Sequence, residues 1–402
     1  MTERRESRVL KFTNVRVLRD GQLRNEYFWV ADGKVIDPQS RFWQRHSEVD
    51  HAPDEIIDGR GCILAPGFID VQINGGFGLD FSSPAISESE IEFVAHNLVS
   101  TGVTAFCPTL VSSSAEVYHA ILPKFRVTSD GEKRRAANIL GVHLEGPFIN
   151  VECKGAHDAG VIVAPTNGLK SLEERYGPLD HVKIITLAPE LPGAMDAIQA
   201  LCERGIVASG GHSQANVDVA IKAVGAGMRM LTHVFNAMGP FHHRDPGLIG
   251  LLGLTEKRPF YGLILDGVHS HPTSARIVRT CHPQGLVVVT DAMAGMGLAP
   301  GAYDLAGQQV EVREDGAYLA GTNTIAGSAV TMDSCIRTMV EYTGCSVVEA
   351  LEAATLHPAQ VLGIEHKKGT LAFGSDADFV LLDDSLHVKR TYIAGELVYD
   401  KF

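Results

Sequence analysis

The sequence predicts an α/β fold, namely a (β/α)8, TIM-like barrel with a small β sandwich formed by both ends of the chain. Between residues 66 and 368, eight β-rich runs alternate with helical patterns over about 250 residues, the usual size of such a barrel. These runs are almost continuously apolar, which is typical of parallel strands covered on both faces. Residues 1–65 and 369–402 contain short β runs and turns, and we expect these two segments to form one domain.

The strands and helices follow from local patterns. Ser87 and Ser346 each begin a capping-box pattern, and Asn216 is a typical N-cap residue, so helices are expected to start there. Residues 40–55 are polar and are expected to form a loop. The predicted barrel strands are Phe68–Ile73, Val103–Pro108, Ile139–Glu145, Val182–Ala188, Ile206–Gly210, Met230–Phe235, Tyr261–Asp266 and Leu286–Thr290.

Composition limits the function. The 402 residues are 45% hydrophobic and 21% charged, an ordinary globular composition. A net charge of −13 disfavours nucleic acids and anionic membranes as partners, and no apolar run approaches the roughly 20 residues of a membrane span. Seven scattered cysteines without a CxxC pair predict reduced thiols and a cytoplasmic protein. The residues after Met1 are charged, with no apolar stretch following, so no signal peptide is expected.

Polar residues gather at the predicted carboxyl ends of the strands, where barrels of this kind place their chemistry. Glu145 ends the third strand, His212 follows the fifth and His233 lies in the sixth. Two imidazoles and one carboxylate are a recurrent zinc set with an open position for water. Asp291, at the end of the eighth strand, is then a candidate proton acceptor. Each residue alone also has a structural reading, such as a hydrogen-bonded histidine or an aspartate capping a turn.

The chain contains six further motifs, namely Pro66–Asp70, His143–Pro147, Gly211–Ser213, Thr232-His233 with Asn236–Met238, Val289–Ala292 and Gly374–Asp378. Together they resemble the amidohydrolase superfamily over essentially the whole chain. Within it, they are similar to the branch, in its animal form, that deacetylates N-acetylglucosamine 6-phosphate. This resemblance implies hydrolysis of the acetamide by a metal-activated water, which gives D-glucosamine 6-phosphate and acetate.

The resemblance also implies a single metal ion. Many members carry His-x-His on the first strand for a second metal, whereas this chain has Gln72 and Asn74. Amides are poor zinc ligands compared with imidazole. One divalent ion per subunit is therefore predicted on Glu145, His212 and His233. The ligand types favour Zn²⁺, with iron, cobalt and manganese as alternatives.

Roles for further residues come from the same resemblance. Asp291 would take the water proton and pass it to the leaving amine, and His157 would hold the carbonyl oxygen. Arg244 can grip a phosphate, in the family across the interface of a homodimer. Without the resemblance, His157 is a solvated loop residue and His269 a cap or core residue. The implied substrate-binding residues are Ala156, Asn236, Ala237, His243, Arg244 and His269.

Two other functions remain open at this point. Another amidohydrolase, such as a cyclic-amide hydrolase or a deaminase, would share the fold but would not need the His243-Arg244 loop. A catalytically inactive assembly protein would have lost metal ligands, whereas Glu145, His212 and His233 are all present. We also expect Met293–Gly297 to form a flexible loop, and Ser328 to cap a following helix.

Overall fold

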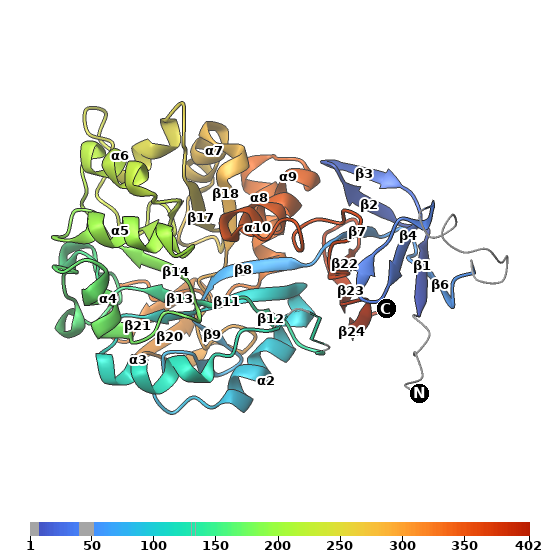
Figure 1. The fold of residues 1–402 in the computed structure, drawn as a ribbon, viewed down its shortest axis with the longest axis horizontal. Helices are drawn as coiled ribbons and strands as arrows, with labels where there is room; N and C mark the ends of the chain where they lie inside the picture. The colour runs from blue at the N-terminus through green and yellow to red at the C-terminus, as the bar shows by residue number, and fades with distance from the viewer. Residues whose placement is uncertain (1–7, 40–51, 130, 133) are drawn as a thin grey trace.

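The computed structural model describes residues 8–39, 52–129, 131–132 and 134–402. The charged segment after Met1 and most of the expected loop over 40–55 lie outside these residues, and Glu55 already begins a strand. Figure 1 shows the predicted parallel barrel, whose strands neighbour one another in chain order. They are β8 (Phe68–Ile73), β11 (Val103–Val111), β13 (Val142–Glu145), β14 (Val182–Leu187), β15 (Val207–Gly210), β16 (Met230–Leu231), β17 (Phe260–Ile264) and β18 (Leu286–Val289).

The third and sixth strands differ most from the prediction. The third run divides into β12 (Asn138–Ile139) and β13, with Gly141 at a φ of 131° between them. The sixth run forms a strand only over β16, because His233 and Phe235 have positive φ angles of 29° and 79°. Backbone in that region cannot continue a strand. His233 and Phe235 therefore lie in the turn that follows β16.

The barrel closes between its first and last strands. The backbone N–H of Asp291 donates to the carbonyl of Gln72 at 2.8 Å, and that of Asn74 donates to the carbonyl of Ala292 at 2.7 Å. These bonds lie just beyond the end of β18. Closure therefore sets the end of the eighth strand beside the end of the first.

Helices cover the outside of the barrel (Figure 1). After β16 a 3-10 helix, η6 (Gly247–Gly253), takes the place of an α-helix. In the part of the chain that the structure describes, no helix combines the length and the hydropathy needed to cross a bilayer. The α-helices are α2 (Glu88–Leu98), α3 (Ala115–Ile121), α4 (Leu169–Tyr176), α5 (Ala194–Glu203), α6 (Val217–Ala226), α7 (Pro272–Cys281), α8 (Met332–Thr343), α9 (Val347–Ala353) and α10 (Leu356–Leu362).

The helix-start predictions are confirmed with one exception. Ser87 and Ser346 form capping boxes at the starts of α2 and α9, and Asn216 caps α6. Ser328 does not cap α8, because its hydroxyl donates to the carbonyl of Thr290 at 2.6 Å. The helix begins four residues later, at Met332.

An antiparallel sheet that was not predicted is inserted between β18 and α8. It consists of β19 (Gly301–Leu305), β20 (Gln308–Arg313) and β21 (Gly316–Leu319). Ala306 and Gly307 join the first two strands with φ angles of 50° and 79°, as a type I′ hairpin turn requires. This sheet packs on Met293, which is fully buried. The expectation of a flexible loop over Met293–Gly297 is therefore wrong.

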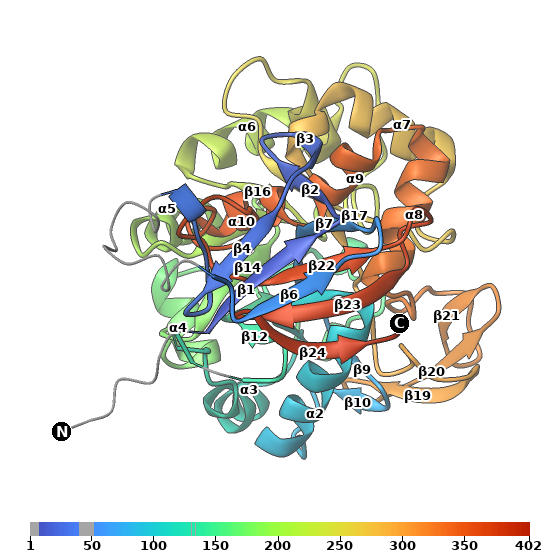
Figure 2. The same ribbon diagram turned by 90° about the vertical axis from the view of Figure 1, so that its right-hand side faces the viewer.

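The two chain ends build two further sheets beside the barrel, which we call the β unit (Figures 1 and 2). Phe12, Phe28, Phe379 and Tyr392 pack between the sheets, with ring centroids 4.6–6.0 Å apart. The β unit therefore has a core built from both ends of the chain. One sheet contains β5 (Lys34–Val35), β4 (Phe28–Ala31), β1 (Val9–Thr13) and β6 (Glu55–Asp58), and the other β24 (Glu396–Asp400), β23 (Val388–Ile393), β22 (Phe379–Leu382), β7 (Ile63–Pro66), β2 (Arg16–Arg19) and β3 (Gln22–Asn25).

Candidate active site

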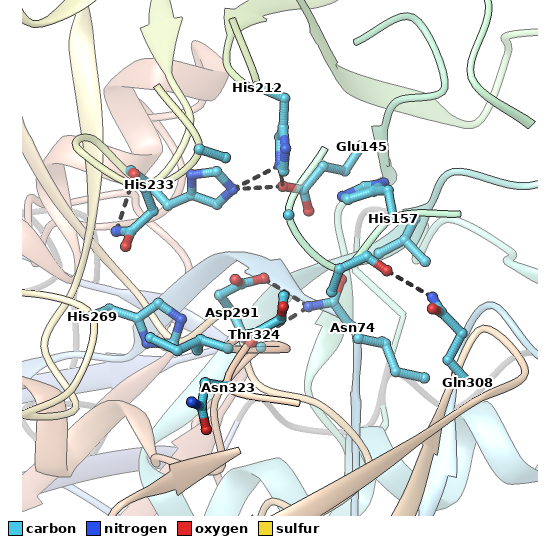
Figure 3. Close-up of a pocket in the computed structure, with 18 residues that line it drawn as sticks. Asn74, Glu145, His157, His212, His233, His269, Asp291, Gln308, Asn323 and Thr324 are labelled. Atoms are coloured by element: carbon cyan, nitrogen blue, oxygen red, sulfur yellow. Dashed lines mark hydrogen bonds and ion pairs between the residues drawn. The ribbon is translucent and has the colours of Figure 1, made fainter. Parts of the chain in front are cut away.

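A cavity of about 280 Å³ lies at the carboxyl ends of the barrel strands (Figure 3). It brings together residues that lie far apart in the sequence. All the predicted site residues except His243 and Arg244 line it. Those that line it are Glu145, Ala156, His157, His212, His233, Asn236, Ala237, His269 and Asp291.

Three buried side chains converge on one point in this cavity. The Nε2 atoms of His212 and His233 lie 3.1 Å apart, and they lie 3.1 and 2.9 Å from Oε1 of Glu145. Nδ1–H of His212 donates to the carbonyl of Cys153 at 2.8 Å, so its Nε2 presents a lone pair to the same point. Imidazole nitrogens and a carboxylate oxygen in this arrangement suit a divalent metal ion.

Glu145 carries the charge that such an ion requires. Burial opposes its ionisation, but the interactions with the neighbouring imidazoles of His212 and His233 outweigh burial and hold the pKa of this carboxyl well below its usual range. Nδ1 of His233 is buried and has no hydrogen-bond partner among the described residues. The three side chains thus form a charged, buried donor set.

Asp291 lines the same cavity, just after β18 (Figure 3). Its Oδ1 accepts hydrogen bonds from Nδ2 of Asn74 at 2.7 Å and Nε2 of Gln72 at 3.2 Å. Burial and the negative charge of Glu145 raise the pKa of Asp291 to about 6. A carboxyl group with a pKa this close to neutrality can accept a proton and return it within one reaction cycle.

His157 is a buried residue rather than a solvated one. Its ring packs against that of His212, with centroids 4.5 Å apart, and burial lowers its pKa to about 3, so the imidazole is neutral. The backbone N–H of Ser112 donates to Nδ1 at 3.3 Å, which places the ring hydrogen on Nε2. A neutral imidazole with Nε2–H can donate a hydrogen bond to a carbonyl oxygen.

His269 and Asp266 form a pair after β17. Nδ1 of His269 lies 2.7 Å from Oδ2 of Asp266, whose Oδ1 accepts the backbone N–H groups of Val268 and His269 at 2.9 Å. Burial opposes ionisation of Asp266, but these bonds lower its pKa below the usual value. The hydrogen of His269 is therefore held on Nδ1, and Nε2 remains for a ligand in the cavity.

Four of the non-glycine residues that line the cavity have left-handed backbone conformations. The φ angles are 48° at His212, 29° at His233, 51° at Ala237 and 48° at Asp291. Positive φ is uncommon outside glycine and costs of order 1–3 kcal/mol at each residue. Such residues gather at functional sites, where the surrounding structure holds them in place. The backbone therefore marks the same residues as the side-chain chemistry.

His243 and Arg244 are the predicted site residues that the structure does not bring into the cavity of one chain. They lie in the exposed loop before η6. No lysine or arginine is among the described residues that line the cavity. A lysine or arginine that contacts a phosphate bound there would have to come from outside this lining.

The sequence prediction missed one wall of the cavity. Gln308 of β20, together with Asn323 and Thr324 after β21, lines the cavity beside His157 and His269 (Figure 3). Nε2 of Gln308 donates to the carbonyl of Ala156 at 2.7 Å. The Asp-Gly pair that begins β21, preceded by alternating apolar residues in β20, was the available hairpin signal.

Comparisons with known proteins agree with this geometry. Residues 63–398 match the model of the Amidohydrolase family. The chain is 52% identical over 398 residues to N-acetylglucosamine-6-phosphate deacetylase of Bos taurus, covering 97% of this chain and 96% of that protein. It is similar to the crystal structure of N-acetylglucosamine-6-phosphate deacetylase from Pasteurella multocida, with a TM-score of 0.85, 28% identity, and 97% and 99% of the two chains covered. It is also similar to a mutant of the Mycobacterium smegmatis enzyme in complex with N-acetyl-D-glucosamine-6-phosphate, with a TM-score of 0.82, 30% identity, and 98% and 99% covered.

Proposed function

This chain belongs to the amidohydrolase family, and from that premise we propose that it hydrolyses N-acetyl-D-glucosamine 6-phosphate to D-glucosamine 6-phosphate and acetate. One observation carries the proposal. A single cavity gathers a donor set for a divalent metal, a proton carrier and a hydrogen-bond donor for a carbonyl oxygen. An assembly protein without activity would have no need of this combination.

Each residue of the site has its own role in the proposed reaction. Glu145, His212 and His233 would hold one divalent ion, which when bound supplies an activated water and polarises the acetyl carbonyl. His157 donates Nε2–H to the carbonyl oxygen as negative charge develops there. Asp291 accepts the proton of the attacking water and delivers it to the departing nitrogen. This second transfer matters as much as the first, because an unprotonated amine is a poor leaving group.

The sugar would be held by the remaining residues of the cavity. His269 offers Nε2 as an acceptor because its Nδ1 is bonded to Asp266. Asn236 and Ala237 lie in the turn after His233, where side-chain and backbone donors face the cavity. The carbonyl of Ala156 is taken by Gln308, so Ala156 would contribute its backbone N–H.

The phosphate would be bound by His243 and Arg244 of a second copy of the chain. Both residues lie in an exposed loop, and guanidinium groups bind phosphate well. Phe241 of this loop is a large exposed apolar side chain (60%). Ile221 (44%) and Ile277 (61%) are also exposed, on α6 and α7, the two helices that contact η6. A homodimer interface here would cover these side chains and bring the basic loop to the other subunit.

Zinc is the ion that we propose, one per subunit. Two imidazoles and one carboxylate are a common catalytic zinc set. Gln72 and Asn74 give poor support for a second ion, since amides are weak zinc ligands. All seven cysteines are unpaired, which fits a reducing, cytoplasmic environment.

The test is deacetylation by the purified, metal-loaded protein. N-acetylglucosamine 6-phosphate and unphosphorylated N-acetylglucosamine are compared, each with and without chelator, followed by metal add-back. We expect turnover of the phosphorylated sugar that chelator abolishes and added metal restores. Metal binding without turnover of either sugar would contradict the proposed substrate and favour another amide or a ring deaminase.

Arg244→Ala tests the phosphate site. Because a charged hydrogen bond contributes about 1.5–3 kcal/mol, KM for the phosphorylated sugar should rise about 10- to 100-fold. Steady-state kinetics of Arg244→Ala are compared with those of Arg258→Ala, in which the replaced exposed arginine donates to the carbonyl of Cys281. An unchanged KM in Arg244→Ala would exclude this residue from the phosphate site.

A further inference from the structure

Two amide side chains at the end of the first barrel strand contact the proton carrier. Nδ2 of Asn74 donates to Oδ1 of Asp291 at 2.7 Å (Figure 3), and Nε2 of Gln72 lies 3.2 Å from the same oxygen. Nε2 of Gln72 also lies 3.2 Å from both oxygens of Glu145. One amide thus contacts Asp291 alone, whereas the other bridges Asp291 and a residue of the proposed metal set.

The oxygens of these amides are left without partners. Oε1 of Gln72 and Oδ1 of Asn74 are buried, and neither has a hydrogen bond among the described residues. Reversing either amide would turn its oxygen toward a carboxylate, which has only acceptors to offer. The nitrogens must therefore face the carboxylates, and the buried oxygens reduce stability. A native structure keeps such a destabilising group where the function requires it.

We propose that Gln72 and Asn74 are positioning residues that fix the Asp291 carboxylate and thereby assign the proton transfer to its Oδ2. Both donors are on Oδ1. Among the described residues, no group donates a hydrogen bond to Oδ2. Two donors on one oxygen prevent the carboxylate from turning and leave the lone pairs of the other oxygen free for a proton.

This assignment rests on the proposed function and completes its proton path. The O–H bond of the attacking water breaks as its hydrogen forms a bond with Oδ2 of Asp291. At the same time its oxygen forms a bond with the acetyl carbon, and the π pair of the carbonyl group moves onto the carbonyl oxygen. The Oδ2–H bond then breaks as the proton moves to the nitrogen. The C=O bond re-forms, the C–N bond breaks, and the amine departs with the electron pair of that bond. The two proton transfers need no acid or base other than Asp291.

Leucine replacements separate positioning from structure. Asn74→Leu removes the donor to Asp291 together with the buried oxygen, so kcat should fall about 10- to 100-fold while KM and metal content stay as in the parent chain. Its melting temperature should not fall, because the unpartnered oxygen is also gone. Gln72→Leu also removes the contact with Glu145, so it should lower metal affinity about 10-fold, measured by chelator competition, as well as kcat.

Asn138→Leu is the matched control. Asn138 is another buried amide whose Nδ2 faces a carboxylate, Oδ2 of Asp378 at 3.4 Å, at the start of β12 and away from the cavity. Its replacement should leave kcat unchanged. A parent-like kcat in Asn74→Leu would overturn the proposal, provided that the parent chain turns over the substrate. Loss of folding in both Asn74→Leu and Asn74→Ala would also overturn the proposal, because it would show that Asn74 has a structural role. Absence of turnover in the parent chain would instead overturn the proposed function, and this inference with it.

Discussion

Single residues of the site are held in conformations that reduce stability. His212, His233 and Asp291 have positive φ angles, and the amide oxygens of Gln72 and Asn74 are buried without partners. Each strained backbone costs of order 1–3 kcal/mol. The surrounding barrel must therefore supply the stability that keeps these groups in place. Replacing one of them should change function more than it lowers stability.

His212→Ala should abolish metal binding. The variant removes one of three converging donors and leaves His233 and Glu145 as an incomplete set. Metal content per chain after dialysis should fall from about one to near zero. His181→Ala, at an exposed histidine outside the cavity, should keep the full content. A full complement of metal in His212→Ala would exclude this residue as a ligand.

Asp291→Asn should keep the metal and lose turnover. The amide has nearly the same shape but cannot carry the water proton, so kcat should fall about 10²- to 10⁴-fold. Asp218→Asn, at an exposed carboxylate of α6, should have the kcat of the parent chain. A near-normal kcat in Asp291→Asn, with metal present, would remove Asp291 as the proton carrier.

Residue types at strand ends were enough to predict that Glu145, His212, His233 and Asp291 come together, because the carboxyl ends of parallel strands meet at one end of the barrel. Their roles as metal ligands and proton carrier stay predictions. Their hydrogen-bond directions could not be predicted. Gln72 and Asn74 were interpreted only as missing histidines, whereas their contacts with Asp291 appear only once the barrel is closed. His143 of β13 is a further case, since only the structure shows that its ring lies at hydrogen-bond distance from the carbonyl of Val71 and the hydroxyl of Thr186.

Among the elements that were not predicted, the inserted sheet β19–β21 contributes most to the lining of the cavity. Val310 and Val312 of β20 alternate with polar residues, and Asp315-Gly316 marks the turn. This pattern is typical of a hairpin. However, the alternation of strands and helices in a (β/α)8 barrel predicts a helix after the eighth strand. Only the packed structure shows that the sheet covers Met293 and adds Gln308 to the cavity.

Gln308→Ala tests whether this sheet helps to form the substrate pocket. The side chain ties β20 to the carbonyl of Ala156, next to His157, at 2.7 Å. Losing a bond of about 0.5–1.5 kcal/mol should raise KM about 2- to 10-fold and leave the melting temperature nearly unchanged. Gln309→Ala, whose side chain is exposed on the next residue, should have the KM of the parent chain. Equal KM values in the two variants would contradict a role for Gln308.

The whole molecule is a barrel joined to the β unit by charged as well as apolar contacts. Lys368, after α10, lies 2.5 Å from Asp378 and 2.9 Å from Asp376, which also lies 2.5 Å from Lys34 of β5. Burial alone would lower the pKa of Lys368, but the two carboxylates raise it to about 12. The barrel and the joining of the chain ends were predictable from apolar runs. The division at residues 66 and 368 into two domains stays a prediction.

The seam that closes the barrel contains a titratable group. Asp70 of β8 is fully buried and accepts the hydroxyl of Thr290 at 2.6 Å. Burial raises its pKa from 3.8 to about 7. Between these two values the folded chain binds a proton that the unfolded chain does not. The contribution of Asp70 to stability is therefore greatest below about pH 4 and is lost as the pH rises through about 7.

Asp70→Asn should remove this pH dependence, because its amide cannot ionise. Because the pKa of Asp70 rises from 3.8 to about 7 on folding, this carboxyl should lower the unfolding free energy of the parent chain by about 3 kcal/mol between pH 5 and pH 8. Denaturant unfolding at pH 5 and pH 8 should show that the fall in unfolding free energy between these pH values is about 3 kcal/mol smaller in Asp70→Asn than in the parent chain. Asp218→Asn should keep the loss seen in the parent chain. If Asp70→Asn lost as much stability as the parent, the buried carboxyl at the seam would have to be ionised already at pH 5.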